Sequence, residues 1–160
     1  MVEVVAGDGP PRREGRRLTL DPAVPAHYGA VFADLPSDGP VHVAYLWSLD
    51  AGTGGLPGDE ELRAAVAHGF DSLMLTIQAL GDLPAEREVR LLTVTGGAAE
   101  ILGGDIPAPH QALAHGLGRA ARHEYPALTW RGLDLDPETV GTPAHGPAPE
   151  AGDGGGAGRS

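Results

Sequence analysis

Three short apolar runs, separated by segments with helical spacing, constrain the fold of this 160-residue chain most. The first, Val41–Trp47, is apolar almost throughout, which is typical of a strand buried on both faces of a parallel sheet. The other two, Val89–Thr95 and Leu128–Leu135, are rich in the aliphatic and β-branched residues that strands favour. Strands that alternate with helices predict an α/β layer fold with a mostly parallel sheet and right-handed crossovers.

Helical segments are expected between these strands. The first begins at Asp59, where a run of acids favours a helix N-terminus, and ends near Gly81, a candidate C-cap. Gly69 is expected to kink or divide this helix. The second runs from about Ala108 to Glu124 and ends before Pro126, because the residue before a proline avoids the α region. Its apolar face is expected at four-residue steps: Leu113, Leu117 and Ala121.

The segment before Val41 carries weaker signals. Val2–Val5 and Leu18–Leu20 are expected to form short strands, separated by a Gly/Pro turn and an Arg-rich stretch. A helix is expected from Pro25, because the missing N–H of proline costs nothing in a first turn. Its apolar face is expected at positions i, i+3, i+4 and i+7: Tyr28, Val31, Phe32 and Leu35.

The charged residues exclude several kinds of chemistry. The 22 Asp and Glu outnumber the 11 cationic residues, all of them Arg, and give a net charge of −11. Lys, Cys and Asn do not occur in the sequence. Without Cys there is no thiolate metal site or thiol nucleophile, and without Lys there is no Walker A or Schiff-base lysine. A surface this acidic repels phosphate backbones, so we expect no nucleic-acid partner.

Two parts of the chain differ in composition. Residues 1–140 hold the strand and helix patterns and are expected to form one domain. Residues 141–160 are rich in Gly, Pro and Ala and are expected to be a disordered tail. No apolar run reaches the length of a membrane span, and no signal-peptide pattern stands at the N-terminus. We therefore expect a cytoplasmic protein without a membrane partner.

Two glycine-rich turns follow strands, at the position where α/β proteins hold nucleotide phosphates. Gly52–Gly58 follows the first apolar run, but Pro57 and Gly58 separate its glycines from the next helix, and the G-x-G-x-x-G spacing is missing. Gly96-Gly97 is interpreted as a strand-to-loop turn. We therefore predict a solvent loop at Gly52–Gly58 and no cofactor-binding residue.

Other candidates for chemistry are weak. Ser72 lies within a helical pattern and outside a Gly-x-Ser-x-Gly elbow, so a solvent-facing or back-bonded serine is predicted rather than a nucleophile. Asp134 and Asp136 stand at the carboxyl end of a strand, where functional groups occur in α/β proteins, although an edge or capping role is commoner. Trp47 and Trp130 are predicted to be core or interface anchors.

The seven histidines do not form a metal-binding pattern. No two are spaced i, i+4, and His115 and His123, eight residues apart, have no third ligand nearby in the sequence. Surface or capping roles are expected for the whole set: His27, His42, His68, His110, His115, His123 and His145. The sequence therefore predicts no catalytic residue and no metal ligand.

A series of short segments fits one protein family in its order along the chain: Val43–Ala51, Gly69–Leu73, Gln78–Gly81, Leu92–Ala98, Pro109–Ala112, Gly116–Arg119, His123–Pro126 and Gly132–Asp136. Together they resemble the N-terminal, structural half of the ketoreductase domain of modular type I polyketide synthases. The resemblance covers roughly Val2 to Pro137, and its motifs are specific in combination although weak singly.

The resemblance implies a Rossmann-like three-layer fold, related to short-chain dehydrogenases, that has lost cofactor binding. In the family this half packs against a catalytic half, which carries the Gly-rich NADPH loop and the Ser, Tyr, Lys and Asn that reduce a carrier-bound β-ketoacyl thioester. None of these residues can be placed on this sequence. The family pattern also has another strand and helix before the segment matching Val2. That strand would lie centrally, so we expect a sheet that is incomplete there, with a neighbouring strand lacking ladder partners.

The leading hypothesis is a non-catalytic, truncated structural module that stabilises a catalytic ketoreductase half or other synthase domains by packing. On this hypothesis the chain is not an enzyme on its own and holds no cofactor, whereas the complete family domain uses NADPH. Three alternatives stay open: a nucleotide-binding Rossmann-like protein that uses Gly52–Gly58, a small hydrolase that uses Ser72 or a histidine, and a non-functional gene fragment.

Overall fold

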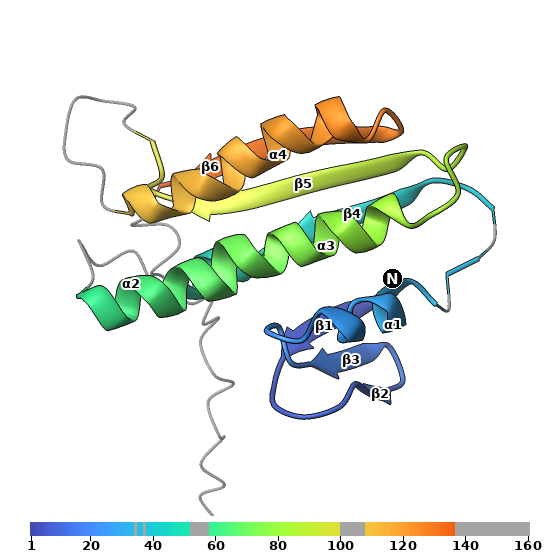
Figure 1. The fold of residues 1–160 in the computed structure, drawn as a ribbon, viewed down its shortest axis with the longest axis horizontal. Helices are drawn as coiled ribbons and strands as arrows, with labels where there is room; N and C mark the ends of the chain where they lie inside the picture. Colours follow the sequence, from blue (N-terminus) through green and yellow to red (C-terminus); the bar gives the residue numbers. More distant parts are fainter. Residues whose placement is uncertain (34, 37, 52–57, 100–107, 137–160) are drawn as a thin grey trace, which may run out of the picture.

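A parallel sheet forms the centre of the molecule (Figure 1). The computed structural model describes residues 1–33, 35–36, 38–51, 58–99 and 108–136. The sheet contains three strands in the order β4-β5-β6: β4 (Val41–Tyr45), β5 (Val89–Gly96) and β6 (Leu128–Leu135). Val41 lies opposite Val89, which in turn lies opposite Leu128. The predicted parallel sheet is confirmed, and the fold is Rossmann-like.

Helices cover one face of this sheet (Figure 1). α2 (Asp59–Val66) continues through a π-helical turn at Ala67–Asp71 into α3 (Ser72–Gly81). α4 (Ala112–Glu124) follows a 3-10 turn at Pro109–Gln111 and packs against β6 and β5. The predicted division of the first helix is confirmed, because Gly69 is buried within the π turn that separates α2 from α3.

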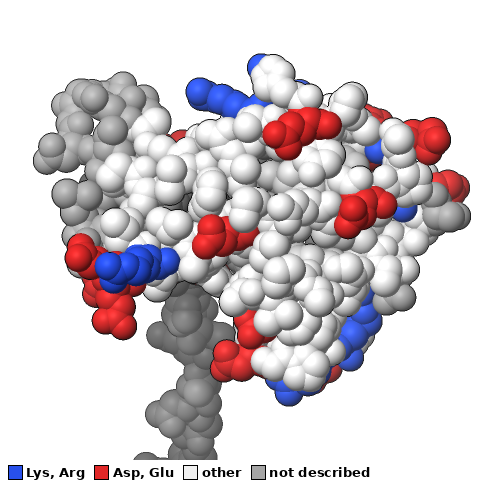
Figure 2. All heavy atoms as spheres, viewed as in Figure 1, with Lys and Arg blue, Asp and Glu red and all other residues white. Residues whose placement is uncertain are grey.

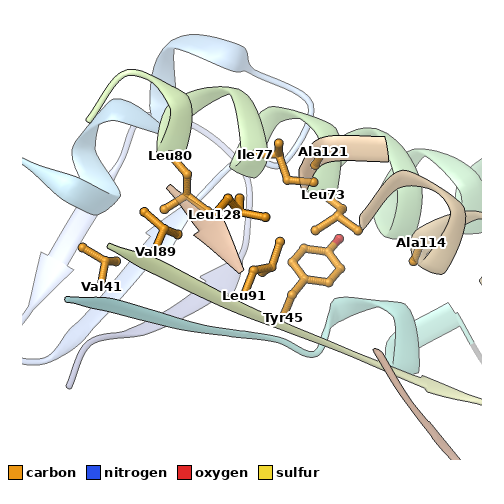
Figure 3. Close-up of a cluster of buried hydrophobic side chains, with 10 residues drawn as sticks. All are labelled: Val41, Tyr45, Leu73, Ile77, Leu80, Val89, Leu91, Ala114, Ala121 and Leu128. Carbon is orange, nitrogen blue, oxygen red and sulfur yellow. The ribbon is translucent and has the colours of Figure 1, made fainter. Parts of the chain in front are cut away.

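The side chains between these helices and the sheet form the main hydrophobic core (Figure 3). Leu73, Ile77 and Leu80 of α3 lie over the strands, and each is almost fully buried. Burying an aliphatic side chain of this size stabilises the fold by roughly 1.5–3 kcal/mol. The whole cluster comes from β4, α3, β5, α4 and β6: Val41, Tyr45, Leu73, Ile77, Leu80, Val89, Leu91, Ala114, Ala121 and Leu128.

β4 carries exposed side chains on the face of the sheet away from the helices, which corrects one prediction. Along β4, Val41 and Tyr45 face the helices and are buried, whereas His42 and Ala44 alternate with them and are exposed. The predicted burial of this strand on both faces is therefore wrong. A continuous apolar run does not reveal that, in the described residues, helices pack on only one of its faces.

A second, smaller sheet precedes the central one. It contains β1 (Glu3–Ala6), β2 (Arg12–Glu14) and β3 (Arg17–Leu20) in the order β1-β3-β2. β1 and β3 are parallel, and β2 returns antiparallel to β3. The helix expected from Pro25 is a 3-10 turn, Pro25–His27, followed by the short α1 (Gly29–Phe32).

α3 joins the two sheets. Leu18 and Leu20 of β3 form a second buried cluster with Tyr28. Leu75 and Ala79 of α3 pack against that cluster, while Leu73, Ile77 and Leu80 of the same helix pack on the central sheet. Trp47 contacts both clusters. Its predicted role as a core anchor is confirmed.

The apolar face predicted for α4 is confirmed at Ala121, which is buried, and at Leu117, which is partly buried against the core, but it is wrong at Leu113. Leu113 is 45% exposed, whereas Ala114, Gly118 and Ala121 are buried. Gly118 lies directly against the indole ring of Trp130 on β6, so a small residue and not a leucine occupies the closest approach of helix and sheet. Trp130 is partly buried against the core, as predicted.

Some predictions fall outside the described residues, including most of the Gly52–Gly58 loop and the tail at residues 141–160. Within the described ranges, no helix is both long enough and apolar enough to cross a membrane.

Replacing Gly118 by alanine tests the packing of α4 on β6. A methyl group at this position would overlap the Trp130 indole, so we expect Gly118→Ala to lower the free energy of unfolding by about 1–3 kcal/mol. Gly116→Ala in the same helix is the matched control, because a methyl group there meets no atom within 4 Å. The control should gain up to about 1 kcal/mol from helix propensity. Urea denaturation followed by circular dichroism measures both, and equal effects would contradict the packing.

Candidate functional site

A ligand site is expected at the carboxyl edge of the central sheet, because open α/β sheets bind ligands outside the carboxyl ends of their strands. Two features occupy this edge. One is a hydrogen-bonded network at the ends of β5 and β6, and the other is a groove beyond the ends of β3 and β4.

Asp134 is the centre of the network. Its Oδ1 accepts a hydrogen bond from the Thr95 hydroxyl at 2.6 Å and another from the Ala98 N–H at 3.0 Å. Its Oδ2 accepts one from the Ala99 N–H at 2.9 Å. Both carboxylate oxygens are therefore engaged in holding the turn after β5. The predicted capping role of Asp134 is confirmed, whereas Asp136 is exposed at the strand end.

Thr95 links Asp134 to a histidine. The Thr95 oxygen lies 3.1 Å from Nε2 of His115 on α4. Burial lowers the pKa of His115. The nearby Asp134 carboxylate partly opposes this shift and the Arg119 guanidinium adds to it, so the imidazole is neutral at pH 7. Because the single hydroxyl proton of Thr95 is directed to Asp134, the assigned pattern is donation from His115 to Thr95 and from Thr95 to Asp134.

This order of donors is not that of a nucleophile and its base. A catalytic histidine must accept the proton of the nucleophile, whereas His115 donates to Thr95. Thr95 is also fully buried, so a substrate cannot reach its hydroxyl. The three residues tie α4, β5 and β6 together at the carboxyl edge.

A second contact closes the same edge. The side-chain oxygen of Gln111, which is 3% exposed, accepts the N–H of Gly96 at 2.9 Å. Gly97 then turns the chain with a φ of +72°, a conformation that favours glycine. Its N–H donates to Leu135 and its carbonyl accepts from Ala108. The interpretation of Gly96-Gly97 as a strand-to-loop turn is confirmed.

The groove holds about 690 Å³ and is lined by residues that follow β3, by Asp50 after β4, and by one side of the helix formed by α2, the π turn and α3. Three carboxylates line it, those of Asp50, Glu61 and Asp71. His68 also lines it, stacks on Trp47 with ring centres 5.4 Å apart, and lies 3.4 Å from an Asp50 oxygen. A pyrophosphate placed here would meet like charges instead of the N–H groups and cations that favour it.

Ser72 follows Asp71, which lines this groove, and is fully buried. Its hydroxyl bonds the carbonyl of His68, one helical turn earlier, and the hydroxyl of Tyr45. The Tyr45 hydroxyl also contacts the carbonyl of Gly69 at 2.8 Å. Burial raises the pKa of Tyr45 and keeps the phenol protonated. Of the two roles predicted for Ser72, back-bonding is confirmed and solvent exposure is wrong, because the buried hydroxyl donates to the carbonyl of His68 in the π turn.

The remaining histidines are spread over the molecule. His42 and His123 are exposed on β4 and α4, and His110 sits in the turn before α4 with its pKa lowered by burial. Among the described residues, no three His, Asp or Glu side chains gather as a metal ion would require. Sequence analysis missed Thr95 and Gln111. The signal for Thr95 was its place at the end of a strand beside the one that ends in Asp134.

Comparisons with known proteins agree with this architecture. Residues 4–153 match the family described as the Rossmann fold domain of the polyketide synthase extender module SpnB. The polyketide synthase GfsA of Streptomyces halstedii is 40% identical over 82 residues, which are 51% of this chain and 1% of that protein. The chain therefore spans a very small part of the curated relative that it matches.

Solved reductase structures share the fold at low sequence identity. One is a multidomain structure with the adenylation, ketoreductase and pseudo-Asub domains of a keto acid-selecting NRPS module, with TM-score 0.69 and 20% identity over 83% of this chain and 11% of that one. Another is an N-terminal ketoreductase from the macrolactin assembly line, with TM-score 0.61 and 18% identity over 84% and 27%. A short-chain dehydrogenase/reductase from Vibrio parahaemolyticus has TM-score 0.54 and 16% identity over 75% and 59%.

Removing the Asp134 carboxylate tests its structural role. Asp134→Ala leaves the Thr95 hydroxyl and two backbone N–H groups without their acceptor, so we expect a loss of about 2–3 kcal/mol in the free energy of unfolding. Asp38→Ala, at an exposed aspartate, is the control and should change it by less than about 0.5 kcal/mol. Chemical denaturation measures both. A neutral Asp134→Ala would contradict the capping role.

The buried His115 predicts a pH dependence of stability. Its folded-state pKa lies below the ordinary 6.5, so the unfolded chain takes up the proton more readily. The free energy of unfolding should therefore be greatest above pH 6.5 and fall as the pH is lowered below it. His115→Gln cannot titrate and should flatten this fall between about pH 7 and about pH 5. Denaturation series at several pH values measure the slope, and an unchanged slope would show that His115 does not contribute.

Proposed function

The chain belongs to the family of Rossmann fold domains of polyketide synthase extender modules, and from that premise we propose a non-catalytic structural role for it. On this proposal it is the structural half of a β-ketoacyl reductase and stabilises an NADPH-dependent catalytic half that lies outside these 160 residues. The catalytic half would transfer hydride from NADPH to the β-carbon of a carrier-bound β-ketoacyl thioester and a proton to its oxygen.

The state of Asp134 is the observation that supports this proposal most. In a Rossmann-type reductase the carboxyl edge must stay open, because the dinucleotide and the substrate bind there. Here both oxygens of Asp134 bind groups of the chain itself, and Gln111 closes the neighbouring strand end. These polar groups at the carboxyl edge form hydrogen bonds within the chain, as expected of a structural domain.

Nucleotide binding by this chain is disfavoured by charge. The groove along α2 and the π turn carries Asp50, Glu61 and Asp71, and none of the described residues that line it is an Arg. The sequence also contains none of the Lys and Asn that resemblance assigns to the catalytic half. We therefore propose that the chain holds no NADPH. The cytoplasm remains its predicted compartment.

The outer face of α4 is the surface that we propose for docking the catalytic half. Leu113, Gly116 and Ala120 are exposed at helical spacing on this side, and Leu113 is 45% exposed. Figure 2 shows that charged side chains are scattered over the helix layer, with wide uncharged surface between them. A smooth apolar helix face can pack closely against another helix, so burying it would stabilise an assembly.

Thermal denaturation of a separately produced catalytic half tests the proposal. Adding the full chain at about 100 times its dissociation constant should raise the melting temperature by roughly 5–10 °C, because the chain binds only the folded partner. Leu113→Asp should remove most of this rise by placing a charge in the interface.

Leu133→Asp is the matched control for that experiment. Leu133 is 46% exposed, which is close to the exposure of Leu113. It lies on β6, and its side chain faces away from the helices. It should leave the rise intact. No rise with the unaltered chain would refute the structural role, and an equal loss in both variants would refute α4 as the docking surface.

A further inference from the structure

Two side chains at the carboxyl edge of the central sheet carry buried polar atoms that bond no other described residue. These atoms are the Ser48 hydroxyl oxygen and both ring nitrogens of His110. Ser48 lies in the 3-10 turn after β4, Trp47–Ala51, and is only 1% exposed. His110 lies in the 3-10 turn before α4, Pro109–Gln111. Buried polar groups are nearly always hydrogen-bonded in folded proteins, so these atoms need a further partner.

Ser48 and His110 line the same small cavity. About 10 Å³ of this cavity is open to the centre of a water molecule, which is roughly the space that a single water needs. Its other walls include Ala65 of α2, Phe70 of the π turn and Ala114 of α4. A wholly apolar cavity would stay dry, whereas two polar groups are the fewest that hold a buried water.

The chemistry of the two side chains also fits water. A serine hydroxyl can donate and accept, and a neutral imidazole offers one donor and one acceptor nitrogen. Burial lowers the pKa of His110, which favours the neutral ring. A metal ion fits less well, because among the described residues no three His, Asp or Glu side chains gather around this cavity or elsewhere. Water matches both the size of the cavity and its polar groups.

Gly69 of the π turn forms the wall of the cavity beside Ser48. A methyl group at this position would lie 3.7 Å from the Ser48 Oγ and 3.8 Å from the Ser48 Cα, which are ordinary contact distances. A larger side chain could therefore begin here without a clash, and the glycine leaves that space open. π turns within helices are frequent at functional sites, and here the turn shapes one wall of a polar cavity.

We propose that this cavity is a binding site for one structural water molecule, which bridges the Ser48 hydroxyl and a ring nitrogen of His110. The two nitrogens of an imidazole point in different directions, so one water molecule bonds only one of them. The bridge would join the turn after β4 to the turn before α4, next to the point where Gln111 closes the end of β5. The site rests on the cavity and its polar groups and does not depend on the proposed function.

Magnetic relaxation dispersion of the oxygen nuclei of water tests the site on the full chain. This measurement counts the water molecules that stay bound for longer than the protein takes to tumble. Gly69→Ala should lower the count by one molecule, because its methyl group takes up space in the cavity without a clash. Gly116→Ala is the matched control, because a methyl group there meets no atom within 4 Å, and it should leave the count unchanged.

Ser48→Ala tests the polar side of the cavity. It removes one of the two partners of the water, and the remaining imidazole nitrogen is too few to hold a buried molecule. This variant should therefore also lose one molecule from the count. Circular dichroism reports whether each variant is native, and if Gly69→Ala does not fold, Ser48→Ala still decides the question.

Two results would overturn the inference. An equal count in the unaltered chain and in folded Ser48→Ala would show that no long-lived water bridges Ser48 and His110. A loss of the same size in Gly116→Ala would show that the count follows a change in the helices and not a change in the cavity.

Discussion

The hydrogen-bonded series from His115 through Thr95 to Asp134 determines what the carboxyl edge of this protein can do. It joins α4, β5 and β6. The Asp134 carboxylate, which lies at the edge where Rossmann folds bind their ligands, accepts a hydrogen bond from within the chain. Because Thr95 is fully buried, the series stabilises this edge of the sheet and keeps the Thr95 hydroxyl out of reach of a substrate. On the proposed function, a fold that other proteins use for nucleotide chemistry serves here as a structural support.

A structural role of this kind requires a surface that binds a partner domain as well as a stable core. α3 is packed on two sides, against the central sheet and against the small sheet, and so fixes their relative positions. The outer face of α4, where Leu113 is exposed, is the surface that the proposed function uses.

The sequence predicted features that depend on local pattern. The parallel strands, the division of a helix at Gly69 and the capping role of Asp134 follow from residue type and spacing, and the structure confirms them. It could not predict the Thr95–His115 contact, because the residues lie 20 positions apart and meet only when α4 packs on β5. The exposure of Leu113 could not be predicted either, because it depends on the contact between the Trp130 indole and Gly118, which only the folded structure shows.

Titration of the full chain with NADPH, followed by calorimetry, tests the central claim most directly. An acidic groove and a carboxyl edge closed by its own hydrogen bonds predict no saturable binding at concentrations up to about 1 mM. Stoichiometric binding with a dissociation constant in the micromolar range would contradict the account, because it would show that this edge still serves the chemistry of a reductase.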